Sequence, residues 1–123
     1  MSLLCYNIDE VLIMNEEIKL YLKNYPSKIV DLFERLRQII FESVNVSIEE
    51  KMWAKLPTYY AGELFVRLIP FKDHINIEAS AIINYKSELY NYKITPKGML
   101  QLFIDQEIPS DLLINIFKKT LMK

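Results

Sequence analysis

The first third of the chain repeats apolar residues at the spacing of amphipathic helices. Asn15 is a suitable N-cap for a first helix. Pro26 suits the first turn of a second helix. The second helix is expected to end near Val44, because the Asn and Ser side chains that follow compete for backbone hydrogen bonds. Its apolar positions recur every three or four residues, at Ile29, Leu32, Phe33, Leu36, Ile39 and Ile40.

The middle of the chain changes to a period of about two, which is typical of β-strands. Ala61-Gly62 separates two such runs and predicts a hairpin. Residues 82–92 return to helical spacing, and Pro109-Ser110-Asp111 predicts the start of a C-terminal helix. The predicted strands are residues 51–54, 58–60, 63–69, 73–78 and 99–104.

This order of elements predicts an α+β fold. We expect an antiparallel sheet of about four to six strands, with N-terminal helices and a C-terminal helix packed on one face. Residues 14–123 are expected to form a single domain, since the helical pattern begins at Met14. Residues 1–13 are expected to be a peripheral arm, and residues 1–3 resemble a leader left by an expression vector.

Composition and charge narrow the classes of function. The chain is 51% hydrophobic. Its net charge of −1 creates no electrostatic field strong enough to attract nucleic acid or a membrane surface, so we expect neither as a partner. The single cysteine, Cys5, and the single histidine, His74, cannot form a zinc site of nitrogen and sulfur ligands. No export signal or transmembrane run is evident, so we expect a cytoplasmic protein.

The motifs of the common enzyme classes are missing. The chain has only two glycines, Gly62 and Gly98, so neither a phosphate-binding loop nor a dinucleotide fingerprint can be formed. No nucleophile elbow, HExxH or EF-hand loop occurs either. We therefore expect a domain without catalytic activity. An enzyme that lacks a local motif stays open as an alternative.

Four short sequence motifs resemble those of a known family. They are EEKMW at 49–53, LPTY at 56–59, FKDHI at 71–75 and KG at 97–98. In this order the chain, from about Met14 to its end, resembles the bacterial YdhG-like proteins. The resemblance implies a fold similar to frataxin, and one member of the family has been assigned an iron-chaperone role. The segment 97–104 departs from the family, which tends to place a proline near the end of this strand.

The acidic residues are the candidates for the iron role that the resemblance implies. Residues 1–50 hold nine acidic and five basic residues, and a hard cation needs several carboxylate oxygens on one surface. The candidate ligands for loosely bound iron are Glu16, Glu17, Glu49 and Glu50. Acidic residues in the first turn of a helix are also ordinary structural features, so the competing interpretation is a solvated face.

A binding site of another kind is the alternative. Aromatic and cationic residues near the hairpin suggest a site for a small anionic ligand or a protein partner. Its candidate residues are Trp53, Tyr59, Lys72, His74 and Lys97. Core packing explains the aromatic residues equally well, and His74 on an alternating strand can be purely structural. A homodimer through an uncovered strand edge or sheet face is also open.

Overall fold

The computed structural model describes residues 13–122, which form a six-stranded sheet with helices packed against one face. The helices are α2 (Glu16–Leu22), α3 (Ser27–Ser43), the 3₁₀ helix η2 (Ser80–Tyr85) and α4 (Ser110–Leu121). The strands are β1 (Glu49–Trp53), β2 (Leu56–Ala61), β3 (Leu64–Pro70), β4 (His74–Glu78), β5 (Lys93–Ile94) and β6 (Leu100–Phe103). Their order in the sheet is β1-β2-β3-β4-β6-β5, and every neighbouring pair is antiparallel.

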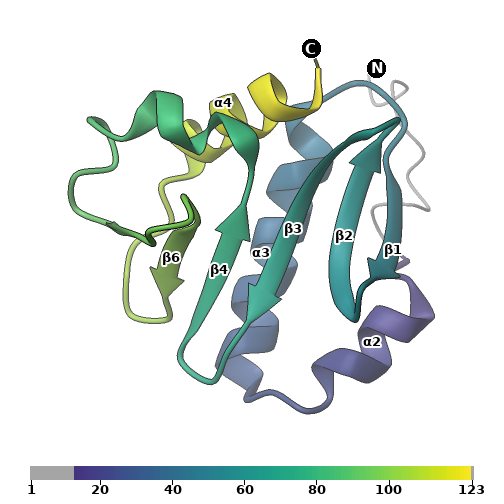
Figure 1. Cartoon of the computed structure of the whole chain (residues 1–123). Coiled ribbons are helices and arrows are strands. Elements are labelled where there is room, and N and C mark those ends of the chain that lie inside the picture. The colour runs from purple at the N-terminus through teal and green to yellow at the C-terminus, as the bar shows by residue number, and fades with distance from the viewer. Residues whose placement is uncertain (1–12, 123) are drawn as a thin grey trace.

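The helices cover only one side of this sheet. In Figure 1, α3 lies behind the strands, α4 runs across the top of the view near the end of β4, and α2 lies near the end of the sheet where β1 ends. Among the described residues no helix covers the face that points toward the viewer. The predicted α+β architecture is therefore confirmed. Within residues 13–122, no helix combines the length and the hydrophobicity needed to cross a bilayer.

The helix boundaries follow the local signals in the sequence. The Asn15 side chain accepts a hydrogen bond of 3.1 Å from the backbone N–H of Ile18 and so caps α2. α3 begins directly after Pro26 and ends at Ser43, where Val44 adopts an extended conformation. The predicted end near Val44 is confirmed, whereas Pro26 is the N-cap of the helix and not part of its first turn.

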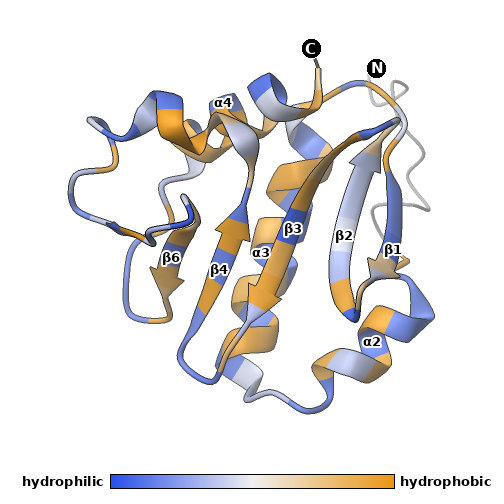
Figure 2. Cartoon of the chain, in the orientation of Figure 1, coloured by the Kyte–Doolittle hydropathy of each residue, from blue (hydrophilic) through white to orange (hydrophobic). Residues whose placement is uncertain are grey.

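The core lies between the helices and the rear face of the sheet. Figure 2 shows apolar and polar residues interspersed along β3 and β4, as expected for strands with one covered face. The fully buried hydrophobic residues of the strands are Tyr59, Val66, Leu68, Ile75, Ile77, Leu100 and Leu102. Those of the helices are Ile18, Ile29, Phe33, Leu36, Ile40, Leu113, Ile116 and Phe117, with Ile82 in η2. Burial of this set accounts for most of the hydrophobic stabilisation.

The predicted helix over residues 82–92 is wrong. Only η2 is helical in this region, and residues 86–91 form turns before β5. Leu89 is buried, and Tyr85 and Tyr92 pack partly buried against the core, but Tyr85 is the last residue of η2 and the three do not lie on a continuous helix. The chain instead crosses to the far edge of the sheet, where Lys93 and Ile94 pair with β6. Nothing in the sequence pattern predicts this two-residue strand.

The hairpin between β1 and β2 has an unusual turn. Trp53 pairs with Leu56, which leaves a two-residue loop of Ala54 and Lys55 with φ angles of 52° and 68°. Two positive φ angles are the mark of a type I′ turn, which normally takes Asn-Gly. A side chain in this region costs about 1–2 kcal/mol. The turn also explains why the strand predicted at 51–54 ends one residue earlier.

Replacing Ala54-Lys55 by Asn-Gly should stabilise the protein by about 1–2 kcal/mol, because these residues accept positive φ angles. Urea unfolding followed by circular dichroism measures the change. The matched control is Gly62→Ala, at a φ of 67° in the β2–β3 turn, where an added Cβ meets no atom within 4 Å. That variant should lose about 1 kcal/mol through backbone strain alone. If the Asn-Gly variant were less stable than the wild type, the conclusion that the β1–β2 turn is strained would be wrong.

Candidate functional site

The uncovered face of the sheet displays aromatic and charged side chains. Strand pairing places residues of one face opposite one another, as for Thr58 with Lys51 and with Arg67. The polar residues of the open face are Glu49, Lys51, Thr58, Arg67, His74, Asn76, Glu78 and Gln101, and its aromatic residues are Trp53, Tyr60, Phe65 and Phe103. Apart from Glu50, the rear face has mostly apolar side chains at the corresponding positions. The open face is therefore the candidate site.

Arg67 is at the centre of the first cluster on this face. Its guanidinium carbon lies 4.9 Å from the ring centroid of Trp53 and 4.7 Å from that of Phe65. Its Nε donates to the Thr58 hydroxyl at 3.2 Å, and Nη1 donates to Glu78 Oε1 at 2.9 Å. The side chain is only 12% exposed. Arg67 is thus a cation held in one orientation by two aromatic rings and two polar partners.

A second cation extends this cluster along β1 and β2. The Lys51 ammonium lies 5.0 Å from the Tyr60 ring centroid, and the Tyr60 and Phe65 rings lie 6.0 Å apart. Lys51 also lies 3.5 Å from Glu49. We call Trp53, Tyr60, Phe65, Arg67 and Lys51 the cation–aromatic patch. Its two cations are both paired with carboxylates of the same face, so the patch presents little uncompensated charge.

His74 belongs to a separate stack at the start of β4. Its ring lies 4.5 Å from that of Phe71, with an interplanar angle of 10°, and 4.7 Å from that of Phe103. Nδ1 and Asp73 Oδ1 lie 2.8 Å apart. An imidazole fixed in this way can offer its other nitrogen to one hydrogen-bonding group of a partner.

The structure does not bring together the five predicted ligand-binding residues. Trp53 and His74 share the open face, and Lys72 is exposed in the turn before His74. Tyr59 lies on the rear face and is fully buried, because alternate residues of a strand point to opposite sides. Lys97 precedes β6, at the end of the sheet away from His74.

The four predicted iron ligands are also dispersed. Glu16 and Glu17 are exposed in the first turn of α2, and Glu49 points to the open face. Glu50, the next residue, points to the rear face and is buried. Among residues 13–122, no group of three or more histidine, cysteine, aspartate or glutamate side chains is placed to hold a metal ion. The iron role stays a prediction from the family resemblance.

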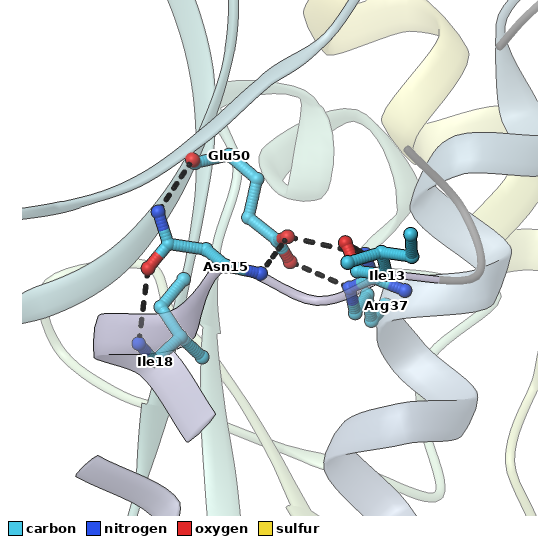
Figure 3. Close-up of polar contacts among 5 residues, drawn as sticks. All are labelled: Ile13, Asn15, Ile18, Arg37 and Glu50. Atoms are coloured by element: carbon cyan, nitrogen blue, oxygen red, sulfur yellow. Dashed lines mark hydrogen bonds and ion pairs between the residues drawn. The ribbon is translucent and has the colours of Figure 1, made fainter. Parts of the chain in front are cut away.

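Glu50 instead belongs to a buried polar cluster that joins three segments (Figure 3). Its Oε2 accepts from Arg37 Nε of α3 at 2.5 Å, and both side chains are less than 10% exposed. Its Oε1 accepts from the backbone N–H of Asn15 at 2.9 Å. Arg37 also donates to the Ile13 carbonyl at 3.4 Å. The cluster fixes the segment before α2 against α3 and β1, which is a structural role.

The Tyr59 hydroxyl lies beside this cluster. Burial, followed by the Glu50 charge, raises the pKa of the phenol well above its usual value. The hydroxyl is buried and makes no hydrogen bond of good geometry to the described residues. Tyr59 is therefore an uncharged part of the core and not a ligand-binding residue of the open face.

Arg67 and Phe65 are two residues of the open face that the sequence pattern does not single out. The alternation of residues 63–69 does place Phe65 and Arg67 on one side of a strand, opposite Val66 and Leu68. The one feature of the sequence that could have indicated Arg67 is that it is a single charged residue in an otherwise apolar strand. Its contact with Trp53 depends on the register across β2, which the sequence does not give.

The comparisons with known proteins add no further identification. No family model, no curated protein and no solved structure matches the chain. The resemblance to the YdhG-like family accordingly stays a prediction, and the function must be argued from the site itself.

Proposed function

We propose that this domain is a non-catalytic binding module that recognises a protein partner through the open face of its sheet. The observation that carries the proposal is the cation–aromatic patch, in which Arg67 is held between Trp53 and Phe65 on an uncovered surface. Trp, Tyr and Arg are the residues that most often dominate the binding energy of protein interfaces. All three types occur in this one patch.

Pre-organisation of the patch favours binding. An arginine with few free rotamers loses little side-chain entropy when a partner covers it. Trp53 is 53% exposed, so much of its ring is free to be buried by a partner. It also directly precedes the strained Ala54-Lys55 turn, and strained backbone tends to occur at functional sites.

The charges of the open face are paired with one another, which favours a protein as the binding partner over nucleic acid or a small anion. Lys51, Arg67 and His74 each lie within 3.5 Å of a carboxylate of Glu49, Glu78 or Asp73. A nucleic-acid surface needs cations that are free to replace counterions around phosphates. A surface of aromatic rings and arginine whose charges are already paired resembles a protein interface, where Tyr, Trp, Phe and Arg are enriched.

The test uses the purified domain as bait in quantitative affinity capture from cells that contain it. We expect a partner that is retained by the wild-type domain and lost by Trp53→Ala. Isothermal titration with the purified partner should then give a Kd at least tenfold higher for Trp53→Ala, since a central tryptophan contributes well over 1 kcal/mol.

The matched control is Tyr90→Ala, which removes an aromatic side chain that is 79% exposed and lies in the turns before β5. This variant should bind like the wild type, and circular dichroism should show that both variants are folded. Captured proteins that are the same for wild type and Trp53→Ala would contradict the proposal. So would a partner whose Kd rises equally for Trp53→Ala and Tyr90→Ala.

A further inference from the structure

A cavity of about 460 Å³ lies at the end of the sheet where β3 begins and β4 ends, and two residues of the open face, Phe65 and Glu78, form part of its lining. Leu64 and Phe65 of β3, Ala79 and Ile83 give it apolar walls. Thr120 of α4 also lines it, with its hydroxyl accepting from the backbone N–H of Ala81 at 3.2 Å. The volume is in the range of metabolite-sized sites.

Opposite charges line this cavity on different strands. Glu63 precedes β3, and Lys97 lies in the turn before β6. Because β4 lies between β3 and β6, the two charged residues flank the cavity from opposite sides. Neither side chain makes an ion pair or hydrogen bond to another residue within 13–122. Glu78, between them, gives one carboxylate oxygen to Arg67 and also lines the cavity.

Lys97 lies in a turn that is closed by hydrogen bonds. The backbone N–H of Gly98 donates to the Thr95 carbonyl at 2.8 Å, and that of Thr95 donates to the Met99 carbonyl at 2.8 Å. The Thr95 hydroxyl accepts from the Met99 N–H at 3.1 Å. Gly98 has a φ of 90°, which favours glycine at this position. These hydrogen bonds restrain the backbone that carries the cation.

We propose that this cavity binds a short peptide with apolar side chains and free termini, with its ammonium group toward Glu63 and Glu78 and its carboxylate toward Lys97. Two strand spacings, from β3 to β6, amount to about 10 Å. An extended peptide of two or three residues covers this length. The apolar walls bury the side chains, and the unpaired charges fix the direction of the peptide.

The tripeptide Ala-Leu-Ala is the probe for this site, titrated into the ¹⁵N-labelled domain by NMR. We expect saturable shifts at the amides of Phe65, Ala79 and Gly98, with a Kd of about 0.1–1 mM. The same peptide with an acetylated N-terminus or an amidated C-terminus should bind about fivefold more weakly, as for loss of one exposed ion pair. No saturable shift up to about 10 mM, or shifts confined to other amides, would overturn the proposal.

Two variants assign each terminus to its residue. Lys97→Gln should weaken binding of the free peptide about fivefold but leave the Kd of the C-amidated peptide unchanged. Glu63→Gln should also weaken binding of the free peptide about fivefold, but it should leave the Kd of the N-acetylated peptide unchanged. The control, Lys86→Gln, changes an exposed lysine outside the cavity and should leave every Kd as in the wild type. Equal weakening of free and amidated peptides by Lys97→Gln would overturn the proposed orientation.

This inference does not rest on the protein partner proposed above. Trp53→Ala removes a residue of the open face that does not line the cavity, so it should leave peptide binding unchanged. Failure of the two proposals is therefore distinguishable.

Discussion

Replacing Arg37 by methionine should lower the free energy of unfolding by about 3–5 kcal/mol, because the Glu50 carboxyl group would lose its charged partner in a site that is almost closed to water. The Glu50 side chain is only 8% exposed, and its nearest cation is Arg37. The hydrogen bond from Asn15 would remain but cannot neutralise the charge. Domains of this size have a total stability of about 5–15 kcal/mol, so the variant should be close to unfolding.

The double variant Arg37→Met with Glu50→Gln separates the buried charge from lost packing. Glutamine can still accept from the Asn15 N–H but carries no charge, so we expect the double variant to recover about 2 kcal/mol or more relative to Arg37→Met. Arg35→Met, at an exposed position of the same helix, should change stability by less than about 0.5 kcal/mol. Urea unfolding measures all three. An Arg37→Met variant within 1 kcal/mol of the wild type would contradict this account.

The helices and the central strands were predictable because each depends on signals within a few residues. Pro26 and Val44 bound α3, and the alternation along β3 places Val66 and Leu68 in the core. The segment 82–92 was not predictable in this way. Its apolar residues satisfy a helical period and Leu89 is buried, but residues 86–91 form turns and the chain continues to an edge strand. Long-range pairing with β6 decides that region.

The candidate site was less predictable than the fold. Its main contacts join residues of different strands, as when Arg67 of β3 meets Trp53 of β1 across β2. Such contacts depend on the register of two successive hairpins, and a shift of one residue would turn these side chains to the other face. Tyr59 illustrates the difficulty, because it lies in the same short segment as Tyr60 but points to the core. Glu49 and Glu50 are divided between the two faces in the same way.

Above about pH 10, the free energy of unfolding should fall with rising pH, and part of this fall should come from ionisation of Tyr59 in the unfolded chain. In the unfolded chain a phenol ionises near pH 10, whereas burial, followed by the Glu50 charge, keeps the folded-state pKa of Tyr59 well above that value. Between these two pKa values only the unfolded chain releases the proton. The contribution is thus fully present below pH 10 and is lost at higher pH by up to about 1.4 kcal/mol per pH unit.

Tyr59→Phe isolates this contribution from other tyrosines with raised pKa values, such as Tyr21 and Tyr92, which both proteins retain. At neutral pH the variant should be as stable as the wild type or up to about 1 kcal/mol more stable, because it removes a buried hydroxyl that lacks a good hydrogen bond. By pH 12 its advantage should grow to about 3 kcal/mol. Tyr90→Phe, at an exposed position, should follow the wild-type curve. If wild type and Tyr59→Phe lose stability in parallel from pH 10 to 12, the Tyr59 phenol ionises without unfolding, and the closed environment described for it is incorrect.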